Sequence, residues 1–308
     1  MKKDPFEHLV GQENVKKKLN FYLKAFNATS ISPFLGFFGA KGLGKTVFAN
    51  AYADSLTNQD GRSRAVLEIN CSTIKNNDAF FEQIYFTNIH DKEVTVLFDE
   101  AHELPSDLTA ALLTILDTSD SHVRHFSWKD DTFPFDFKRQ TFLFATTESD
   151  KLFPPLKDRL TSVDFDPYTS DELGKIIKRF IKSSITPDVL KKLSKIVRGN
   201  ARNAILKAKD INLYCASEGI DTFSMPHYKK FCDTLGILPL GLSCTEKQIL
   251  NILSADGACT LSMLSAKTGL STTSLRSDHE KYLLMQNLME IDVKRKITRL
   301  GKEVVELC

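Results

Sequence analysis

The feature that most constrains this chain is residues 34–46, where an apolar run leads directly into a glycine-rich loop. The loop reads Gly39-x-x-x-x-Gly44-Lys45-Thr46, which is the spacing of a phosphate-binding loop between a strand and a helix. Its glycines let successive backbone N–H groups turn toward one anion, and the following helix adds the partial positive charge of its N-terminus. Lys45 can reach the β- and γ-phosphates of a nucleoside triphosphate, and the Thr46 hydroxyl can hold Mg²⁺. Because this pattern arises by chance in about 1% of chains of this length, it predicts a nucleotide site rather than a plain strand-to-helix turn.

Composition narrows the class of protein further. The chain has 308 residues, of which 42% are hydrophobic, enough for two or three small domains with their own cores. Its net charge of +2 means that any nucleic-acid surface must be local. The chain has no long apolar run and does not open on an apolar leader, so we expect neither a membrane span nor secretion. The cysteines lack C-x-x-C spacing, which predicts free thiols in a reducing cytoplasm rather than a zinc site or a disulfide framework.

A second motif follows further along the chain, where the apolar residues 94–98 end in Asp99 and Glu100. A continuous apolar run predicts a strand buried on both faces of a parallel sheet. The carboxyl end of such a strand opens into the crevice where α/β sheets bind ligands. Asp99 is suited to orienting Mg²⁺, and Glu100 is suited to polarising the attacking water. Alone the motif is weak, but after the glycine loop it indicates triphosphate hydrolysis.

A third apolar run, residues 141–145, ends in Thr146 and Thr147. We predict that Thr147 positions water against the γ-phosphate; two threonines that only cap a strand are the alternative. Another strand pattern and two helical patterns alternate with these runs, at residues 64–71, 79–85 and 104–116. Strands that alternate with helices predict an α/β fold with a doubly wound parallel sheet.

Taken in order, these segments resemble an AAA+ ATPase and, more closely, the RuvB family of Holliday-junction branch-migration motors. The similar segments are residues 6–19 (beside the adenine), 42–46 and 99–102 (the nucleotide motifs), 145–147 (sensor 1), 155–160 (the arginine-finger segment) and 199–204 (sensor 2). The resemblance spans nearly the whole chain. It implies an AAA+ parallel-sheet P-loop domain over residues 1–165, a helical lid over 166–235 and a C-terminal winged-helix domain over 236–308.

The resemblance also implies a set of site residues. The implied catalytic residues are Lys45, Glu100, Thr147, Arg159 and Arg202. The implied cofactors are ATP and Mg²⁺, with the metal held by Thr46 and Asp99. The implied nucleotide contacts are Leu9, Val10, Gly39, Gly42, Leu43, Gly44, Lys45, Thr46, Val47, Asp99, Tyr168 and Arg202.

Two of these arginines have defined roles in the family. Arg159 would carry its guanidinium into the site of a neighbouring subunit, and Arg202 would lie over the phosphates from the lid. A surface ion pair is the alternative for Arg159, and a solvated helix face is the alternative for Arg202. Because Arg159 would act in trans, the resemblance implies a homo-oligomeric ring, a hexamer.

One segment departs from the family. Residues 117–139 correspond to the hairpin with which RuvB grips its partner RuvA, but they are shorter and different here. The single tryptophan of the chain, Trp128, lies in this stretch. Its amphipathic ring suits a protein contact, and burial against its own domain is an equal alternative. We predict a possible contact with a junction-binding protein through the segment Arg124–Phe133.

The C-terminal part has the pattern of a DNA-binding module. A capped helix at residues 245–253 is followed by a helix, a glycine turn and a second capped helix over 260–276, the layout of a helix-turn-helix. Residues 293–302 then hold five basic residues and no acidic one, as expected of a wing along phosphates. A merely solvated hairpin is the alternative. The predicted DNA contacts are Lys294, Arg295, Lys296 and Arg299.

These features predict an ATP-driven DNA motor that hydrolyses ATP in a ring, translocates duplex DNA of any sequence and drives branch migration of Holliday junctions. The main alternative is a clamp- or helicase-loader-like switch acting on DNA. Asp99-Glu100-Ala101-His102 also spells the DEAH signature of superfamily-2 helicases, but too few residues follow for a second RecA-like domain. A DNA-binding regulator without turnover would leave Glu100 and Thr147 idle. The sequence leaves the partner protein, the ring size and the direction of movement open.

Overall fold

The computed structural model describes residues 4–117 and 121–307, and the chain forms two compact units. The first contains Met1–Glu172 and Asn200–Arg202, and the second contains Leu173–Gly199 and Asn203–Cys308. The predicted division into three domains stays a prediction, because the second unit groups most of the lid with the winged helix. None of the helices in the described part of the chain has the length and apolarity that a bilayer crossing requires.

The first unit is built on a five-stranded sheet in the order β2-β3-β6-β1-β7, in which all neighbouring strands run parallel. The strands are β1 Leu35–Phe38, β2 Ala65–Asn70, β3 Val94–Asp99, β6 Gln140–Thr146 and β7 Thr161–Asp164. Strands β1, β3 and β6 are almost wholly buried, as their continuous apolar runs predict. The predicted α/β fold with a parallel sheet is therefore confirmed.

The strand register sets the position of the site. Phe38 at the end of β1 pairs with Thr146 at the end of β6, and Asp99 at the end of β3 pairs with Ala145. Three carboxyl ends therefore meet at one edge of the sheet, where parallel sheets bind ligands. The glycine loop begins directly after β1 and so opens at this edge.

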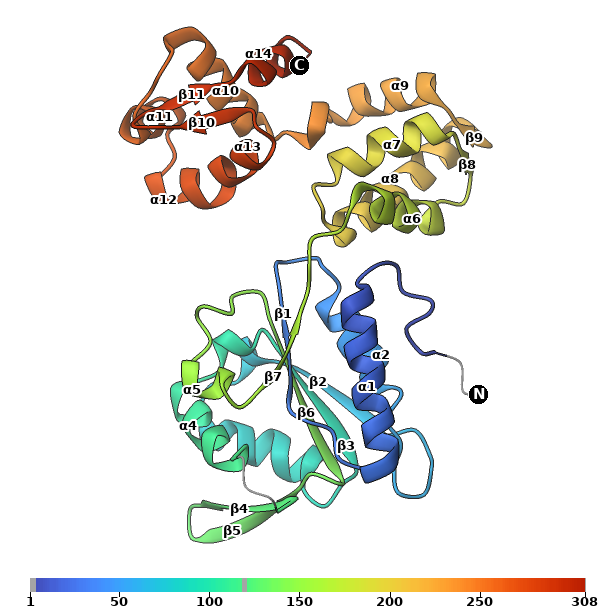
Figure 1. Ribbon diagram of the computed structural model, residues 1–308, viewed down its shortest axis with the longest axis vertical. Helices are drawn as coiled ribbons and strands as arrows, with labels where there is room; N and C mark the ends of the chain where they lie inside the picture. Colours follow the sequence, from blue (N-terminus) through green and yellow to red (C-terminus); the bar gives the residue numbers. More distant parts are fainter. Residues whose placement is uncertain (1–3, 118–120, 308) are drawn as a thin grey trace. The chain divides into compact units, whose positions relative to one another are not determined.

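Helices cover both faces of the sheet (Figure 1), with α1 and α2 on one side and α4 and α5 on the other. The bounds are α1 Glu13–Thr29, η1 Cys71–Thr73, α2 Lys45–Ala53, α3 Asn77–Ala79, η2 Phe80–Ile89, η3 Ala101–Glu103, α4 Ser106–Ile115 and α5 Pro154–Lys157. Helix α4 lies within the helix predicted over 104–116. The helix predicted over 79–85 is instead the short α3 continued by the π-helical η2, a local geometry that apolar spacing does not reveal.

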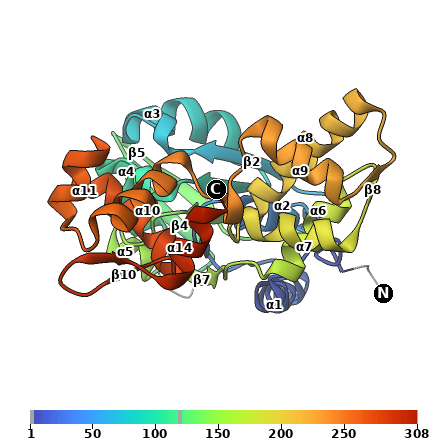
Figure 2. The same ribbon diagram turned by 90° about the horizontal axis from the view of Figure 1, so that it is seen from above.

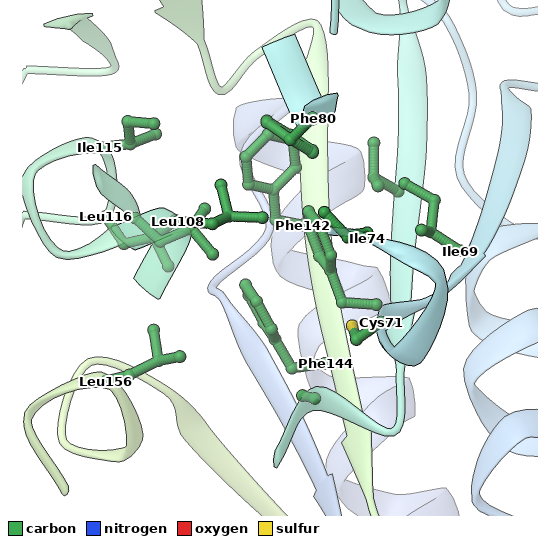
Figure 3. Packing of buried hydrophobic residues seen from close by; sticks show 14 of the residues in the cluster. Ile69, Cys71, Ile74, Phe80, Leu108, Ile115, Leu116, Phe142, Phe144 and Leu156 are labelled. Atoms are coloured by element: carbon green, nitrogen blue, oxygen red, sulfur yellow. The ribbon is translucent and has the colours of Figure 1, made fainter. Parts of the chain in front are cut away.

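The core of the first unit lies between the sheet and the helices of one face. Figure 3 shows aromatic and aliphatic side chains from β6, η2, α4 and α5 converging there, among them Phe142, Phe80, Leu108 and Leu156. All four are fully buried. Burial of each such side chain contributes about 1.5–3 kcal/mol, so this cluster holds the strand ends of the site in place.

The hairpin β4 Val123–Trp128 and β5 Asp131–Asp136 packs on η2 of its own unit. The Trp128 ring stacks on Phe81 with centroids 5.3 Å apart, and its Nε1 donates a 2.9 Å hydrogen bond to Asp78. Lys129 lies 4.2 Å from the centroid of the Trp128 ring and pairs with Glu82 at 2.7 Å. Of the two alternatives for Trp128, the structure shows packing against its own domain.

The second unit begins with a helical lid. Its elements are α6 Ser170–Phe180, β8 Ser184–Ile185, α7 Pro187–Ile196, α8 Ala201–Glu218, β9 Thr222–Phe223 and α9 Met225–Leu235. Apolar residues such as Leu193, Ala208 and Phe231 are fully buried. The connection to the last module is the 3₁₀ turn η4, Pro239–Gly241.

The C-terminal module is a small helical core with a two-stranded wing. Its elements are α10 Cys244–Asp256, α11 Leu261–Thr268, α12 Thr272–Ser274, η5 Leu275–Glu280, α13 Lys281–Met285, β10 Met289–Ile291, β11 Arg295–Ile297 and α14 Arg299–Glu306. Side-chain caps at Ser243, Thr260 and Ser271 begin three of the helices, as these residue types favour. The first of them begins one residue before, and ends three residues after, the helix predicted over 245–253. In Figure 2 the loop that joins β10 to β11 extends away from these helices.

A buried ion pair ties the lid to the winged helix within the second unit. Glu246, on the first turn of α10, is 0% exposed and accepts hydrogen bonds from Arg198. The Arg198 guanidinium also donates to the carbonyl of Gly241 at 2.8 Å and lies 3.9 Å from the centroid of the Tyr282 ring. A Cβ atom at Gly241 would lie 2.2 Å from the carbonyl oxygen of Ile196, so this close approach requires glycine.

Candidate active site

The glycine loop adopts the backbone that a phosphate cradle requires. Gly39, Gly42 and Gly44 have φ values of 151°, 82° and 94°, a region that residues with a side chain rarely adopt. Gly44 is the N-cap of α2, so the first free N–H groups of this helix face the loop. Backbone donors and the helix N-terminus together form a binding site for a phosphate group.

Lys45 lies inside this loop. Its Nζ donates to the carbonyl oxygens of Gly39 at 2.7 Å and Ala40 at 3.0 Å. Burial lowers the pKa of the Lys45 ammonium, while the carboxylates of Glu100 and Asp99 act in the opposite direction. An ammonium held among loop carbonyls is placed to exchange them for phosphate oxygens when a nucleotide enters.

Thr46 and Asp99 meet across the edge of the sheet. The Thr46 hydroxyl lies 3.4 Å from Asp99 Oδ2. Burial raises the pKa of the Asp99 carboxyl, and the N–H of Glu100, which donates to Asp99 Oδ1 at 3.0 Å, opposes this shift. A hydroxyl and a carboxylate are the hard oxygen ligands that Mg²⁺ prefers, so these two residues fit the metal that the sequence implies.

The Glu100 carboxylate faces the end of the neighbouring strand β6. Its Oε2 accepts a hydrogen bond from the Thr147 hydroxyl at 2.9 Å and lies 3.4 Å from the Thr147 amide nitrogen. Glu100 itself has a φ of 52°, an uncommon backbone for a residue with a side chain, and it turns the chain into η3. The structure thus joins the two residues predicted to act on the attacking water.

The sensor 2 segment contacts the glycine loop within the first unit. Asn200 Nδ2 donates to the carbonyl of Lys41 at 3.1 Å, and the Ala201 amide donates to the carbonyl of Gly42 at 3.1 Å. A Cβ atom at Gly42 would lie 2.1 Å from Asn200 Oδ1. Sequence reasoning selected the exposed Arg202 and missed Asn200, which belongs to the same predicted sensor 2 segment. Arg202 lies near enough to lower the pKa of Lys45.

Tyr168 contacts the same loop, and the adenine-side segment contacts the chain just before Tyr168. The Tyr168 hydroxyl donates to the carbonyl of Leu43 at 3.1 Å, and burial raises the pKa of Tyr168 to about 12. Gln12 Nε2 donates to the carbonyl of Asp166 at 2.6 Å, which fixes the turn after the half-buried Leu9 and Val10. Val47, the first exposed apolar residue of α2, is 56% accessible.

Residues 35–167 match the model of the ATPase family associated with various cellular activities, AAA. This segment is an AAA ATPase domain. The match covers the glycine loop, the Asp99-Glu100 strand and the sensor 1 strand whose geometry is given above. The predicted resemblance to AAA+ ATPases is confirmed, and the chain is an ATP-hydrolysing enzyme of this type.

Relatives extend the similarity beyond the AAA domain. The Holliday junction branch migration complex subunit RuvB of Fusobacterium nucleatum is 26% identical over 293 residues, which cover 91% of this chain and 84% of the relative. The RuvB subunit of Thermotoga maritima is 28% identical over 295 residues, with 92% and 85% covered. A solved structure of the T. maritima RuvB Holliday junction branch migration motor has a TM-score of 0.76 at 23% identity and covers 99% of this chain and 98% of its own. This likeness shows that the fold is shared.

Arg159 of the AAA domain is half-buried at the end of α5. Its Nε donates to the carbonyl of Leu113 at 3.1 Å, and its Nη1 donates to the carbonyl of Pro155 at 2.9 Å. These bonds hold the guanidinium on the side of α4 and α5. The partners in these two hydrogen bonds are backbone carbonyls rather than the carboxylate of a surface ion pair, the alternative considered for Arg159.

The predicted DNA contacts of the wing differ in their surroundings. Arg295 donates to Glu280 through Nε at 2.7 Å and through Nη2 at 3.2 Å, and both side chains are largely buried. The DNA contact of Arg295 stays a prediction, and the structure adds that its charge is paired with a carboxylate of its own module. Lys294 and Lys296 are exposed, and Arg299 is exposed with an ion pair to Glu303 at 3.1 Å.

Proposed function

We propose that this chain is an ATP-driven DNA motor that translocates duplex DNA and drives branch migration of four-way junctions. The observation that carries the proposal is the presence, in one chain, of an AAA ATPase domain and a winged-helix module with an exposed basic wing. The two relatives matched over more than nine-tenths of this chain are named as branch-migration subunits. Glycine-loop backbone, Lys45, Glu100 and Thr147 supply the hydrolytic site.

The metal and the oligomer are part of this proposal. Mg²⁺ bound by Thr46 and Asp99 would neutralise charge on the phosphates, and Glu100 would polarise the water. Arg159 would complete the site of the next subunit, which requires a ring, with six copies as the expected number. The carbonyls that Arg159 now binds are neutral, so a phosphate group competes for it on favourable terms.

DNA would contact the wing through Lys294, Lys296 and Arg299. Lysine presents a point charge rather than a base-reading fork, and phosphate contacts carry no sequence information. Such a surface suits a motor that must move over any sequence. The free thiols of the described cysteines, Cys71, Cys215, Cys232, Cys244 and Cys259, support action in the reducing cytoplasm; Cys308 lies outside the described residues.

A second candidate, a clamp- or helicase-loader-like switch, is favoured by one observation. The Trp128 side of the β4–β5 hairpin packs on its own η2, so a junction-binding partner would have to use the exposed side of Arg124–Phe133. A loader would hydrolyse ATP once per loading event instead of translocating, and contact with its protein partner would dominate.

The deciding experiment is a branch-migration assay on a synthetic four-way junction with ATP and Mg²⁺. A motor dissociates the junction into two duplexes and shows ATP hydrolysis that rises with added DNA. ATP hydrolysis with an intact junction supports the loader instead. ATP binding with no turnover on any DNA supports a regulator and contradicts both.

A further inference from the structure

A histidine without a role in the proposed hydrolysis lies beside the Glu100 carboxylate. His102 belongs to η3, the turn that directly follows Glu100, and its side chain is 6% exposed. Its Nδ1 lies 2.8 Å from Thr146 Oγ1 and 3.6 Å from Glu100 Oε2. Its Nε2 lies 3.4 Å from Glu103 Oε1 and 3.6 Å from Glu148 Oε1. The ring therefore bridges the chain after β3 and the chain after β6.

Thr146 fixes the position of this ring. It is the last residue of β6 and is fully buried, so its hydroxyl cannot move away into solvent. The same Oγ1 accepts a 3.1 Å hydrogen bond from the amide of Glu148. A ring held by a fixed hydroxyl on one side and by burial on the other keeps Nδ1 close to the Glu100 carboxylate.

The charges around the ring explain why a histidine is needed there. Glu100, Glu103 and Glu148 all face His102, and Lys151 pairs with Glu148 from the outside. Carboxylates this close repel one another. The ring lies among these carboxylates, with Nδ1 on the side of Glu100 and Nε2 on the side of Glu103 and Glu148.

We propose that His102 is a positioning residue for ATP hydrolysis, which holds the Glu100 carboxylate against Thr147 and keeps the neighbouring carboxylates from displacing it. The proposal rests on the proposed role of Glu100 in polarising water. His102 does not touch the glycine loop in any contact described above. It acts on the chemical step through Glu100 and leaves nucleotide binding unaffected.

The test is His102→Phe in the full chain, because phenylalanine keeps the ring and removes both nitrogens. We expect the kcat of ATP hydrolysis to fall about tenfold or more, as misplacement of a catalytic group commonly costs this much. The KM for ATP, the Kd for a non-hydrolysable ATP analogue and the melting temperature should stay near the wild-type values. His90→Phe is the matched control, since His90 is half-buried directly after η2, beside Tyr85, and should leave kcat unchanged.

Two further variants keep the test informative if His102→Phe folds poorly. Thr146→Val removes the hydroxyl that anchors the ring but leaves the histidine, and should lower kcat by a smaller factor. His102→Gln retains one polar end and should recover part of the lost kcat. Because Thr146 and His102 act on the same carboxylate, the double variant should be no slower than His102→Phe alone.

Glu100→Gln, assayed beside these variants, distinguishes the proposed role of Glu100 from the proposed role of His102. Turnover that survives in Glu100→Gln contradicts the role of Glu100 itself, whatever His102 does. Loss of turnover in Glu100→Gln with a wild-type rate in His102→Phe overturns the positioning role alone. A parallel loss of kcat, analogue affinity and melting temperature in His102→Phe and His102→Gln assigns His102 to folding and also overturns it.

Discussion

The carboxylates of the nucleotide site and those of the winged helix are held in opposite ways. Asp99 and Glu100 lie at a sheet edge and take hydrogen bonds from hydroxyl and amide groups. Glu246 and Glu280 are 0% and 4% exposed, and each binds an arginine through both of its oxygens. The first pair can change partners when nucleotide and metal arrive. The second pair cannot do so without leaving a buried charge uncompensated.

This difference follows from what the carboxylates do: the first pair belongs to the hydrolytic site, and the second pair holds segments of the fold together. A carboxylate that must act on water or metal needs weak, replaceable contacts, because strong pairing with an arginine would compete with its task. A carboxylate that fixes two segments against each other needs the reverse. Substitutions at the two places should therefore be detected by different measurements, turnover in one case and unfolding in the other.

The largest effect is expected for Glu100→Gln. The amide cannot polarise the attacking water, so kcat should fall by about 10²–10⁴-fold, with the free energy of unfolding nearly unchanged. A steady-state ATPase assay with urea unfolding of the same sample checks both. Glu93→Gln, a carboxylate change at the opposite end of β3, should leave turnover intact. Normal hydrolysis by Glu100→Gln would remove Glu100 from the mechanism.

Glu246→Ala should show the opposite pattern. Its removal leaves the Arg198 guanidinium partly buried without a carboxylate. It also removes the acceptor of the Ser243 amide, one of the two hydrogen bonds in the capping box of α10. We expect a loss of about 3–5 kcal/mol in the free energy of unfolding of the second unit, measured by urea denaturation. Glu303→Ala breaks the pair with Arg299, which is 95% exposed, and should cost no more than about 1 kcal/mol. Equal losses for both variants would contradict the comparison.

In the wing, an exposed charge and a buried, paired charge stand at neighbouring positions, Lys296 and Arg295. Lys296→Ala should weaken duplex binding and lower the slope of log affinity against log salt by about one, with no change in unfolding. Arg295→Ala should destabilise the module, because it leaves Glu280 buried and unpaired. Fluorescence-anisotropy titrations over a salt series, paired with urea denaturation, check both. A reduced salt slope for Arg295→Ala in a fully stable protein would instead support Arg295 as a DNA contact.

The smallest effect concerns Cys71, which is buried directly after β2. Burial, with the Asp99 and Glu100 carboxylates in support, raises the pKa of the Cys71 thiol well above its usual range. The thiol therefore stays protonated and unreactive toward iodoacetamide between pH 7 and 9, where exposed Cys244 is alkylated. The raised pKa also favours the folded state below the ordinary thiol pKa, an effect that is lost as the pH rises further. Mass spectrometry of labelled peptides should find Cys71 unmodified in the native protein and modified in urea.

Local patterns were sufficient to predict the strands and the loop of the site. Continuous apolar runs predicted β1, β3 and β6, because a strand that is buried on both faces is apolar at nearly every position. Gly39 and Gly44 were predictable from spacing alone, since a phosphate loop requires their backbone conformations. The order of the strands and the register that joins Asp99 to Ala145 depend on pairing between distant segments, which no local pattern encodes.

The contacts that the sequence did not reveal have the same origin. Arg295 stands in a basic run that is typical of a DNA surface, and only the fold shows that Glu280 lies beneath it. Asn200 carries no charge and lies far from Lys41 in sequence, so its contact with the loop could not be inferred. The role of His102 likewise depends on the end of β6 lying next to the end of β3.

The contact between Asn200 and Lys41 joins residues 159 positions apart. Because a nascent chain leaves the ribosome from its N-terminus at ~5–20 residues per second, β7 emerges a few seconds before Asn200. Throughout that interval the newly made sheet carries an open loop that its closing residue has not yet reached. The order of synthesis therefore means that this contact with the loop forms only after the sheet that carries the loop has been made.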